Sequence, residues 1–176
     1  MSNEERFSNI NEENIICEDI ILIPINEDHI ELIRQWRNAE NLKKTFLSNQ
    51  YITKETQAIW YEKYKNNRQD KMFIISYENE AVGTIALYNI DYNSNCAEFG
   101  RLLIGEVEKR GKSIGVKATK TLCNYGFQKL KLDKIIIEVF KDNLYSINSN
   151  KKVGFEVKCE RNFMGRRLLI MELENK

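Results

Sequence analysis

One short stretch, Arg110-Gly111-Lys112-Ser113-Ile114-Gly115, combines two glycines with two basic side chains just before a long amphipathic run. Glycine lets the backbone approach a ligand closely. The first N–H groups of a helix point at whatever lies over its N-terminus, with about +0.5 of a charge behind them. The residues from Gly111 to Val116 are therefore predicted to bind an anion such as a pyrophosphate. Simple turns before helices use the same residue types, so the surrounding sequence has to decide.

The overall composition narrows the choice of ligand. The chain has 27 lysine and arginine residues against 26 aspartate and glutamate residues, a net charge of +1, which is not typical of proteins that bind nucleic acid or an anionic membrane surface. A zinc site or a disulfide framework is not indicated either, because the cysteines are far apart and there is one histidine (Cys17, Cys96, Cys123, Cys159 and His29). We expect a small or locally charged ligand and no metal.

The ends and the length of the chain suggest its organisation. The 176 residues suit one domain that buries about 70% of the surface of its unfolded form. Residues 1–18 are mostly acidic and polar, so we expect a mobile leader there and a single domain over residues 19–176. No stretch approaches 18 apolar residues, and the N-terminus does not resemble a signal peptide. These features predict a cytoplasmic protein without a membrane partner.

The order of the secondary-structure elements follows from hydrophobic periodicity, caps and turn residues. The short run Ile135 to Phe140 is almost wholly apolar, which predicts burial on both faces. The whole pattern predicts a mixed α/β sheet with helices on both faces. Strands are expected at Ile20–Ile25, Met72–Tyr77, Ala81–Ile90, Cys96–Ile104, Ile135–Phe140, Phe155–Cys159 and Leu168–Leu173, with helices at Glu27–Ala39, from Thr53 to about Asn66, from the Arg110 loop to about Leu130, and from Asn143 to Gly154.

This order, with the basic loop at the start of the third helix and Asn143 to Phe155 downstream, resembles the GCN5-related N-acetyltransferase (GNAT) superfamily from about Ile20 to the end. The resemblance implies a twisted, mostly antiparallel sheet of about seven strands flanked by about four helices, and acetyl-CoA as cosubstrate. The acetyl-CoA loop of the family reads Gln/Arg-x-x-Gly-x-Gly/Ala. Arg110 and Gly115 match it, and Ser113 replaces the middle glycine. At negative φ the Ser113 hydroxyl can donate to a phosphate, and at positive φ the residue is strained by about 1 kcal/mol.

A second family signature matches at Asn143, Ser146 and Gly154-Phe155. The resemblance implies that Asn143 and Ser146 bind the coenzyme, Asn143 through the amides of the pantetheine arm. Asn150 stands where the family has a tyrosine that protonates the departing thiolate, and a carboxamide has no proton to give. A thiol with a pKa near 8.5 leaves with little help, so Asn150 is left to hydrogen-bond the sulfur.

The family places the thioester where two neighbouring strands splay apart. The resemblance therefore implies that a backbone N–H of the strand Cys96 to Ile104, at Leu103 or a neighbour, donates to the carbonyl, and that Leu103 and Ile104 border the pantetheine arm. Glu98 on that strand is the candidate general base, acting through water. The alternative for Glu98 is a solvated carboxylate paired with lysine or arginine.

The acceptor is suggested by similarity within the superfamily. Trp36-Arg37-Asn38, Phe46, Ala97-Glu98-Phe99-Gly100 and Glu138 to Asn143 look like the branch that acetylates the 4-amino group of nucleotide-linked amino sugars, as in pseudaminic acid synthesis. Arg37 offers a fork for phosphate or carboxylate, with a surface salt bridge as the alternative, and Trp36 is otherwise a core residue. The other hypotheses are an N-terminal acetyltransferase of the ribosomal-protein type, another small-amine acetyltransferase, and a catalytically silent CoA-binding module. A homodimer is left open.

Overall fold

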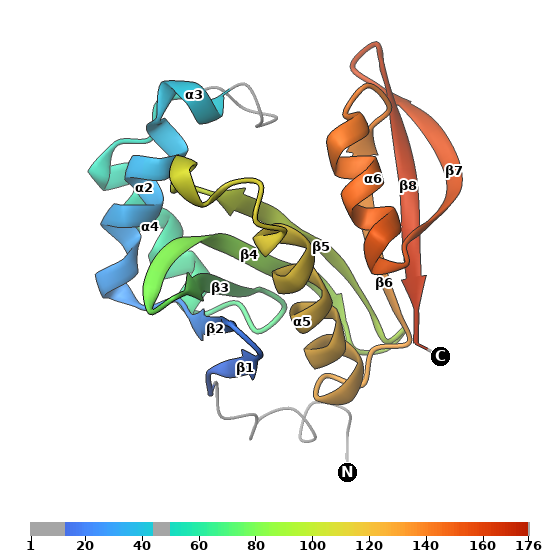
Figure 1. Ribbon diagram of the computed structural model, residues 1–176, viewed down its shortest axis with the longest axis horizontal. Helices are drawn as coiled ribbons and strands as arrows, with labels where there is room; N and C mark the ends of the chain where they lie inside the picture. Colours follow the sequence, from blue (N-terminus) through green and yellow to red (C-terminus); the bar gives the residue numbers. More distant parts are fainter. Residues whose placement is uncertain (1–12, 44–49, 176) are drawn as a thin grey trace.

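A computed structural model describes residues 13–43 and 50–175, whose strands form one eight-stranded sheet in the order β1-β2-β3-β4-β5-β6-β8-β7 (Figure 1). Neighbouring strands are antiparallel except for β5 and β6, which run parallel. The strands are β1 (Ile15–Cys17), β2 (Ile20–Pro24), β3 (Lys71–Tyr77), β4 (Glu80–Asp91), β5 (Cys96–Ile104), β6 (Lys134–Phe140), β7 (Glu156–Phe163) and β8 (Arg166–Glu174). The helices are α2 (Ile30–Asn38), α3 (Glu40–Lys43), α4 (Lys54–Lys65), α5 (Ile114–Gln128) and α6 (Leu144–Val153), with 3-10 turns at η1 (Glu27–His29) and η2 (Val107–Lys109).

The helices begin and end at residues whose side chains or backbone suit those positions. The Asn26 side chain accepts from the Asp28 N–H ahead of α2, and the Thr53 side chain accepts from the Thr56 N–H at the start of α4. Gly154 ends α6 in the left-handed conformation with φ of 118°. These caps confirm the helix starts and the helix end that the sequence predicted.

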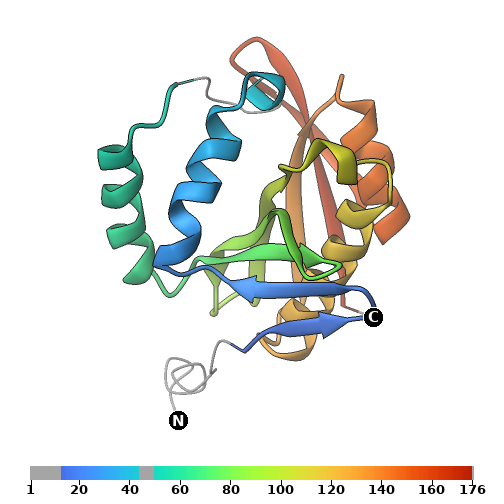
Figure 2. The same ribbon diagram turned by 60° about the vertical axis from the view of Figure 1, so that its left-hand side comes forward.

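Two hydrophobic clusters lie on opposite faces of the sheet, and β3 serves both. Met72 and Ile74 pack with α2 and α4, whereas Phe73 and Ile75 pack with α5 and α6. Alternate residues of a strand point to opposite faces, so one apolar run supplies both clusters. Figure 2 shows α2 and α4 together on one side of the sheet and α5 on the other, which confirms the predicted mixed α/β sheet with helices on both faces.

Two expectations about the strands are wrong. Ile15–Cys17, which we placed in the mobile leader, form β1 and pair with β2, because two isoleucines there can extend its free edge. The strand β6 is buried on one face: Ile135, Ile137 and Val139 point into the core, but Ile136 and Glu138 between them do not. Residues 1–12 of the predicted leader lie outside the described residues.

Three breaks in regularity shape the middle of the sheet. β5 pairs with β6 over three residues, Cys96–Glu98 with Lys134–Ile136, and then continues to Ile104 without that partner. Its register with β4 shifts at Arg101, which has φ of 51°, and the register of β4 shifts at Asn89, which has φ of 48°. Such β-bulges re-aim side chains and bend a strand. In the part of the chain that the structure describes, no helix has the length and apolar character needed to cross a bilayer.

The close approach of β4 and β5 at the Arg101 bulge gives a first prediction. A Cβ atom at Gly83 would overlap the Leu103 carbonyl oxygen. Gly83→Ala should lower the free energy of unfolding by about 1–3 kcal/mol, since backbone has to move to admit the methyl group. Urea unfolding measures it. Gly115→Ala is the matched control, because a Cβ there would make an ordinary contact of 3.5 Å with Leu102. Equal stabilities for the two variants would contradict the prediction.

Candidate active site

The candidate site lies where β5 and β6 diverge. Because the two strands are parallel, their carboxyl ends lie on the same side of the molecule, and the chain leads from each of them into a helix, α5 after β5 and α6 after β6 (Figure 1). Two helix N-termini, each with unpaired N–H groups, therefore border the diverging strands. The edge of β5 beyond Glu98 presents backbone groups without a neighbouring strand on that side. This arrangement suits a ligand with anionic groups and an extended amide chain.

The basic loop has a positive φ at Ser113, the second of the two conformations considered above. Ser113 is the residue before α5 and has φ of 61° and ψ of 14°, and its side chain caps no N–H of the helix. Gly111 also has a positive φ, 82°, with open space where a Cβ would be. The uncapped N–H groups of the first turn, from Ile114 to Val116, fit an anion, at the cost of strain at Ser113.

The basic residues at and just before the loop make different contacts. Arg110 donates from Nε and Nη2 to the Ile104 carbonyl oxygen at 3.2 and 3.0 Å, which ties the loop to the end of β5. Lys109 pairs with Glu78 and Glu80 at 2.8 and 2.9 Å, and these hydrogen bonds raise the pKa of the lysine. Arg110 therefore stabilises the loop against the end of β5, and its contact with a phosphate stays a prediction.

The first turn of α6 contains the second family signature. The Asn143 Oδ1 atom accepts from the Ser146 N–H at 3.0 Å and caps the helix. Asn150 is 4% exposed, and its Nδ2 atom donates to the Ser146 carbonyl oxygen at 2.9 Å and to the Ser146 hydroxyl at 3.2 Å. The Asn150 amide nitrogen therefore already has two acceptors within the helix. The geometry therefore gives no support for Asn150 as a donor to a sulfur.

Trp36, one of the residues proposed for the acceptor, has a structural role here. Trp36 is 6% exposed, its ring lies against Gly105, and its Nε1 atom donates to Glu106 Oε1 at 3.0 Å. Trp36 is thus a core residue that joins α2 to the end of β5, which is the alternative given above. Phe46 lies outside the described residues.

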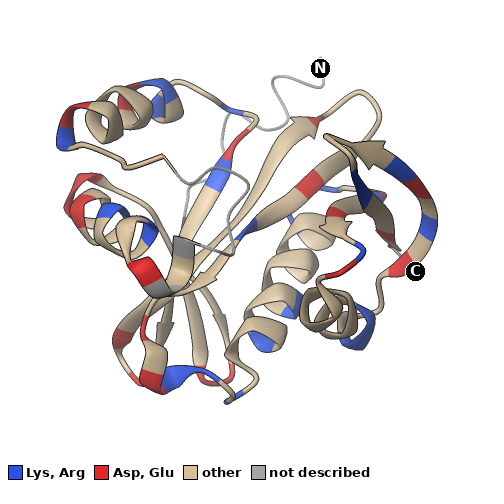
Figure 3. Cartoon of the chain, turned by 90° about the horizontal axis from the view of Figure 1, so that it is seen from above, with Lys and Arg blue, Asp and Glu red and all other residues tan. Residues whose placement is uncertain are grey.

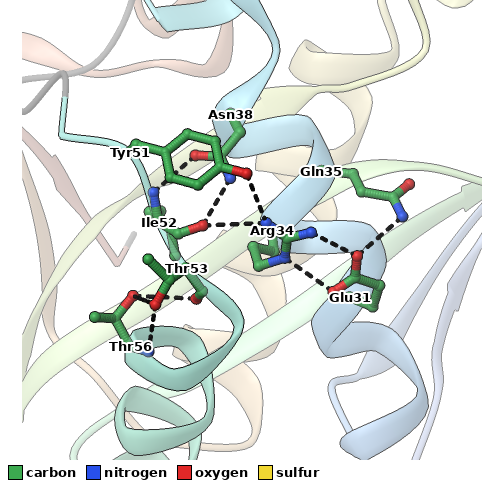
Figure 4. A network of polar contacts seen from close by, with 8 residues as sticks. All are labelled: Glu31, Arg34, Gln35, Asn38, Tyr51, Ile52, Thr53 and Thr56. Carbon is green, nitrogen blue, oxygen red and sulfur yellow. Dashed lines mark hydrogen bonds and ion pairs between the residues drawn. The ribbon is translucent and has the colours of Figure 1, made fainter.

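Asn38 fixes the segment that leads into α4. Its Nδ2 atom donates to the Ile52 carbonyl oxygen at 2.8 Å, and its Oδ1 atom accepts from the Ile52 N–H at 2.9 Å (Figure 4). Arg34 donates to the same carbonyl at 3.2 Å and is held by Glu31 at 2.7 Å. Asn38 therefore holds the segment that leads into α4, and both polar groups of its side chain already have a partner there.

Glu98 lies on the α2 and α4 face of β5 and has two polar neighbours. The Asn89 Nδ2 atom donates to Glu98 Oε1 at 2.9 Å, and burial together with the charge of Glu98 raises the pKa of Tyr88. Tyr88 is the direct cross-strand partner of Glu98, and the bulge at Asn89 brings both side chains to it. The alternative of a Glu98 carboxylate paired with lysine or arginine finds no support in the described residues.

The same face carries a group of residues that the sequence did not single out. Arg101 forms a bidentate pair with Asp70 at 2.7 and 2.8 Å and lies over the rings of Tyr88 and Trp60, 4.8 and 6.0 Å from their centres. Arg37 is near enough for the charge of Arg101, together with burial, to lower its pKa. A tyrosine and an arginine on neighbouring strands were visible in the sequence, but the bulges that bring them together were not.

The comparisons with known proteins agree with this geometry. The family model for the acetyltransferase (GNAT) domain matches residues 19–156. The chain belongs to the GNAT acetyltransferase family. Spermidine N(1)-acetyltransferase of Escherichia coli K12 is 26% identical over 139 residues, 79% of this chain and 74% of that protein. Acetyltransferase PseH of Campylobacter jejuni is 29% identical over 133 residues, 76% and 80% of the two chains. The structure of Vibrio cholerae spermidine N-acetyltransferase with CoA and spermine has a TM-score of 0.80 at 19% identity and covers 90% of this chain and 96% of that one, a likeness of fold.

As a GNAT protein, this chain is an acetyl-CoA-dependent N-acetyltransferase. The site fits the cosubstrate, which supplies the acetyl group as a thioester. The N-termini of α5 and α6 suit its pyrophosphate, and the open edge of β5 suits its amide chain. Among the described residues there is no cluster of three metal-ligating side chains.

The strain at Ser113 gives a prediction about stability. Ser113→Gly should raise the free energy of unfolding by about 0.5–1 kcal/mol, because glycine adopts positive φ without a Cβ clash but loses more freedom on folding. Thermal and urea unfolding measure the gain, and calorimetry should find acetyl-CoA affinity within about threefold of the parent. Ser149→Gly, inside α6, is the matched control and should destabilise. A loss of stability in Ser113→Gly would contradict the prediction.

The pair of Arg101 and Asp70 gives a second prediction for the site. Asp70→Asn should lower the free energy of unfolding by about 1–3 kcal/mol, because the Asp70 side chain is 9% exposed and the guanidinium loses a charged acceptor. Glu62→Gln, which breaks the exposed pair with Lys65, should change it by less than about 1 kcal/mol. Equal losses from both substitutions would show that Arg101 is not held in this way.

Proposed function

We propose that the acceptor amine belongs to an anionic molecule, and that it is the 4-amino group of a nucleotide-linked amino sugar. The observation that carries this proposal is the pair of Arg37 and Arg101 on the Glu98 face, next to the rings of Trp60 and Tyr88. The Arg37 guanidinium, next to the positive charge of the Arg101–Asp70 pair and to aromatic faces, is suited to a phosphate with a base or sugar ring. A bound phosphate would also relieve the repulsion between the two cations.

The state of the acidic residues argues against a polyamine. A polyamine carries several positive charges and needs several free carboxylates. On this face Asp70 is held by Arg101, and Glu138 is held by Arg161 at 2.7 Å. Glu98 makes no ion pair among the described residues and can take up one amine. Acidic and basic residues are interspersed along the elements of the chain (Figure 3), so charge selection has to come from local groups such as these.

The proposed reaction is direct attack of the amine on the thioester. Glu98 takes a proton from the amine through water, and the Leu103 N–H at the bulge of β5 donates to the acetyl oxygen. The Leu103 side chain is buried, which fixes the strand at that point. A cysteine-linked intermediate is disfavoured, because burial raises the pKa of Cys123 to about 12 and Cys96 lies at the opposite end of β5, against Ser94.

The acceptor is tested by following free thiol from acetyl-CoA with a UDP-4-amino sugar, an N-terminal peptide and spermidine in parallel. Turnover with the sugar alone supports the proposal, whereas turnover with peptide or spermidine alone overturns it. Binding of acetyl-CoA without turnover of any acceptor would favour the silent module instead. Because Cys17 and Cys159 are exposed, a blank of protein without acetyl-CoA has to be subtracted.

Arg37 provides a prediction specific to the acceptor. Arg37→Gln should raise KM for the nucleotide sugar about 10- to 100-fold, the worth of one charge-assisted hydrogen bond, with KM for acetyl-CoA unchanged. Steady-state kinetics with each substrate varied in turn measures this. Arg68→Gln, on the exposed turn before β3, is the matched control. An equal change in KM for both substrates, or none, would remove Arg37 from the acceptor site.

A further inference from the structure

Tyr88 lies on the Glu98 face of the sheet, where the acceptor is proposed to bind. Its ring reaches from β4 across β5 and lies over Gly100, where an added Cβ would be 2.9 Å from the Tyr88 hydroxyl and 3.0 Å from Cε1. A glycine at position 100 is therefore needed for this placement. Beyond it, on the far side of β5, Glu138 of β6 is close enough to act electrostatically on the hydroxyl. The hydroxyl thus lies over β5, just past the last pair that β5 makes with β6.

The charged groups that face the hydroxyl come from both strands packed beside it. Glu98 and Arg101 lie on β5 and Glu138 on β6. Burial is the largest cause that raises the pKa of Tyr88, and the two carboxylates outweigh the arginine. Tyr88 therefore keeps its proton at neutral pH and can act as an acid, and the Glu98 carboxyl lies at the directly opposite position on β5.

The geometry points to Tyr88 as the proton donor to the coenzyme A sulfur, recharged by Glu98. As the amine attacks, the N–C bond forms and the C–S bond breaks. Glu98 takes one proton from the amine nitrogen, Tyr88 gives its hydroxyl proton to the departing sulfur, and the proton on Glu98 then returns to the tyrosinate. The net result is transfer of one proton from nitrogen to sulfur, with both side chains restored.

Other residues do not offer this function. The Asn150 amide nitrogen already donates to the carbonyl oxygen and the hydroxyl of Ser146. Tyr125 packs edge to face against Phe73 in the core, and Tyr145 is 81% exposed on α6. Tyr88 differs from these two tyrosines in having a carboxylate beside its hydroxyl at the diverging strands. The inference requires acetyl transfer only and does not depend on which amine is the acceptor.

The test is Tyr88→Phe, which keeps the ring under Arg101. We expect kcat to fall about 100-fold, the usual worth of a positioned acid, with KM for acetyl-CoA within about twofold. The parent kcat should fall at high pH as the tyrosine ionises, and this alkaline limb should be absent from the variant. Tyr61→Phe on α4 is the matched control. Thiol release is measured with any acceptor that the parent enzyme uses, and with water if it uses none.

A double-mutant cycle with Glu98→Gln separates a shared proton path from two independent effects. If the two residues act in sequence, Tyr88→Phe should add less than about threefold to the loss caused by Glu98→Gln. The assignment would be overturned if kcat of Tyr88→Phe stayed within about twofold of the parent, if that variant kept the alkaline limb, or if only its KM for the acceptor changed. Fully multiplicative losses in the double variant would also overturn it. Thermal unfolding of each variant checks that the fold is kept. Failure of the acceptor proposal would appear separately, as a parent enzyme that ignores the sugar.

Discussion

The site depends on one constraint, the loss of pairing between β5 and β6 after Glu98. Backbone N–H and C=O groups are costly to leave unsatisfied, so a strand edge without a neighbour is a place where an amide chain can bind. The same divergence leaves the N-termini of α5 and α6 beside that edge. One departure from regular sheet structure thus leaves an open hydrogen-bonding edge beside two positive helix ends, an arrangement that suits acetyl-CoA.

The bulges at Asn89 and Arg101 organise the other face. Each places a residue other than glycine at positive φ, which costs free energy that the surrounding contacts have to offset. Thr84 helps at the second bulge by donating from its hydroxyl to the Arg101 carbonyl oxygen at 2.8 Å. The bulges place Arg101 against Asp70 and the aromatic rings, and they place two polar side chains beside Glu98.

In the proposed site, the coenzyme side and the acceptor side differ in how they use charge. On the coenzyme side the backbone of helix ends carries the positive potential, while Lys109 and Arg110 are occupied with neighbouring residues. On the acceptor side the charges are side chains, with arginines set against carboxylates. Backbone recognition suits a cosubstrate common to the whole family, whereas side-chain recognition can change with the acceptor.

The sequence by itself determined the order of the elements and the helix caps, because these depend on residues within a few positions of one another. The core position of Trp36 depends on a distant segment, because its Nε1 atom donates to Glu106 after β5. Tyr88, Glu98 and Glu138 come from three strands and meet through the two bulges and the divergence. Register and strand divergence are set by long-range pairing, so only the tertiary structure decided which side chains lie together on the Glu98 face.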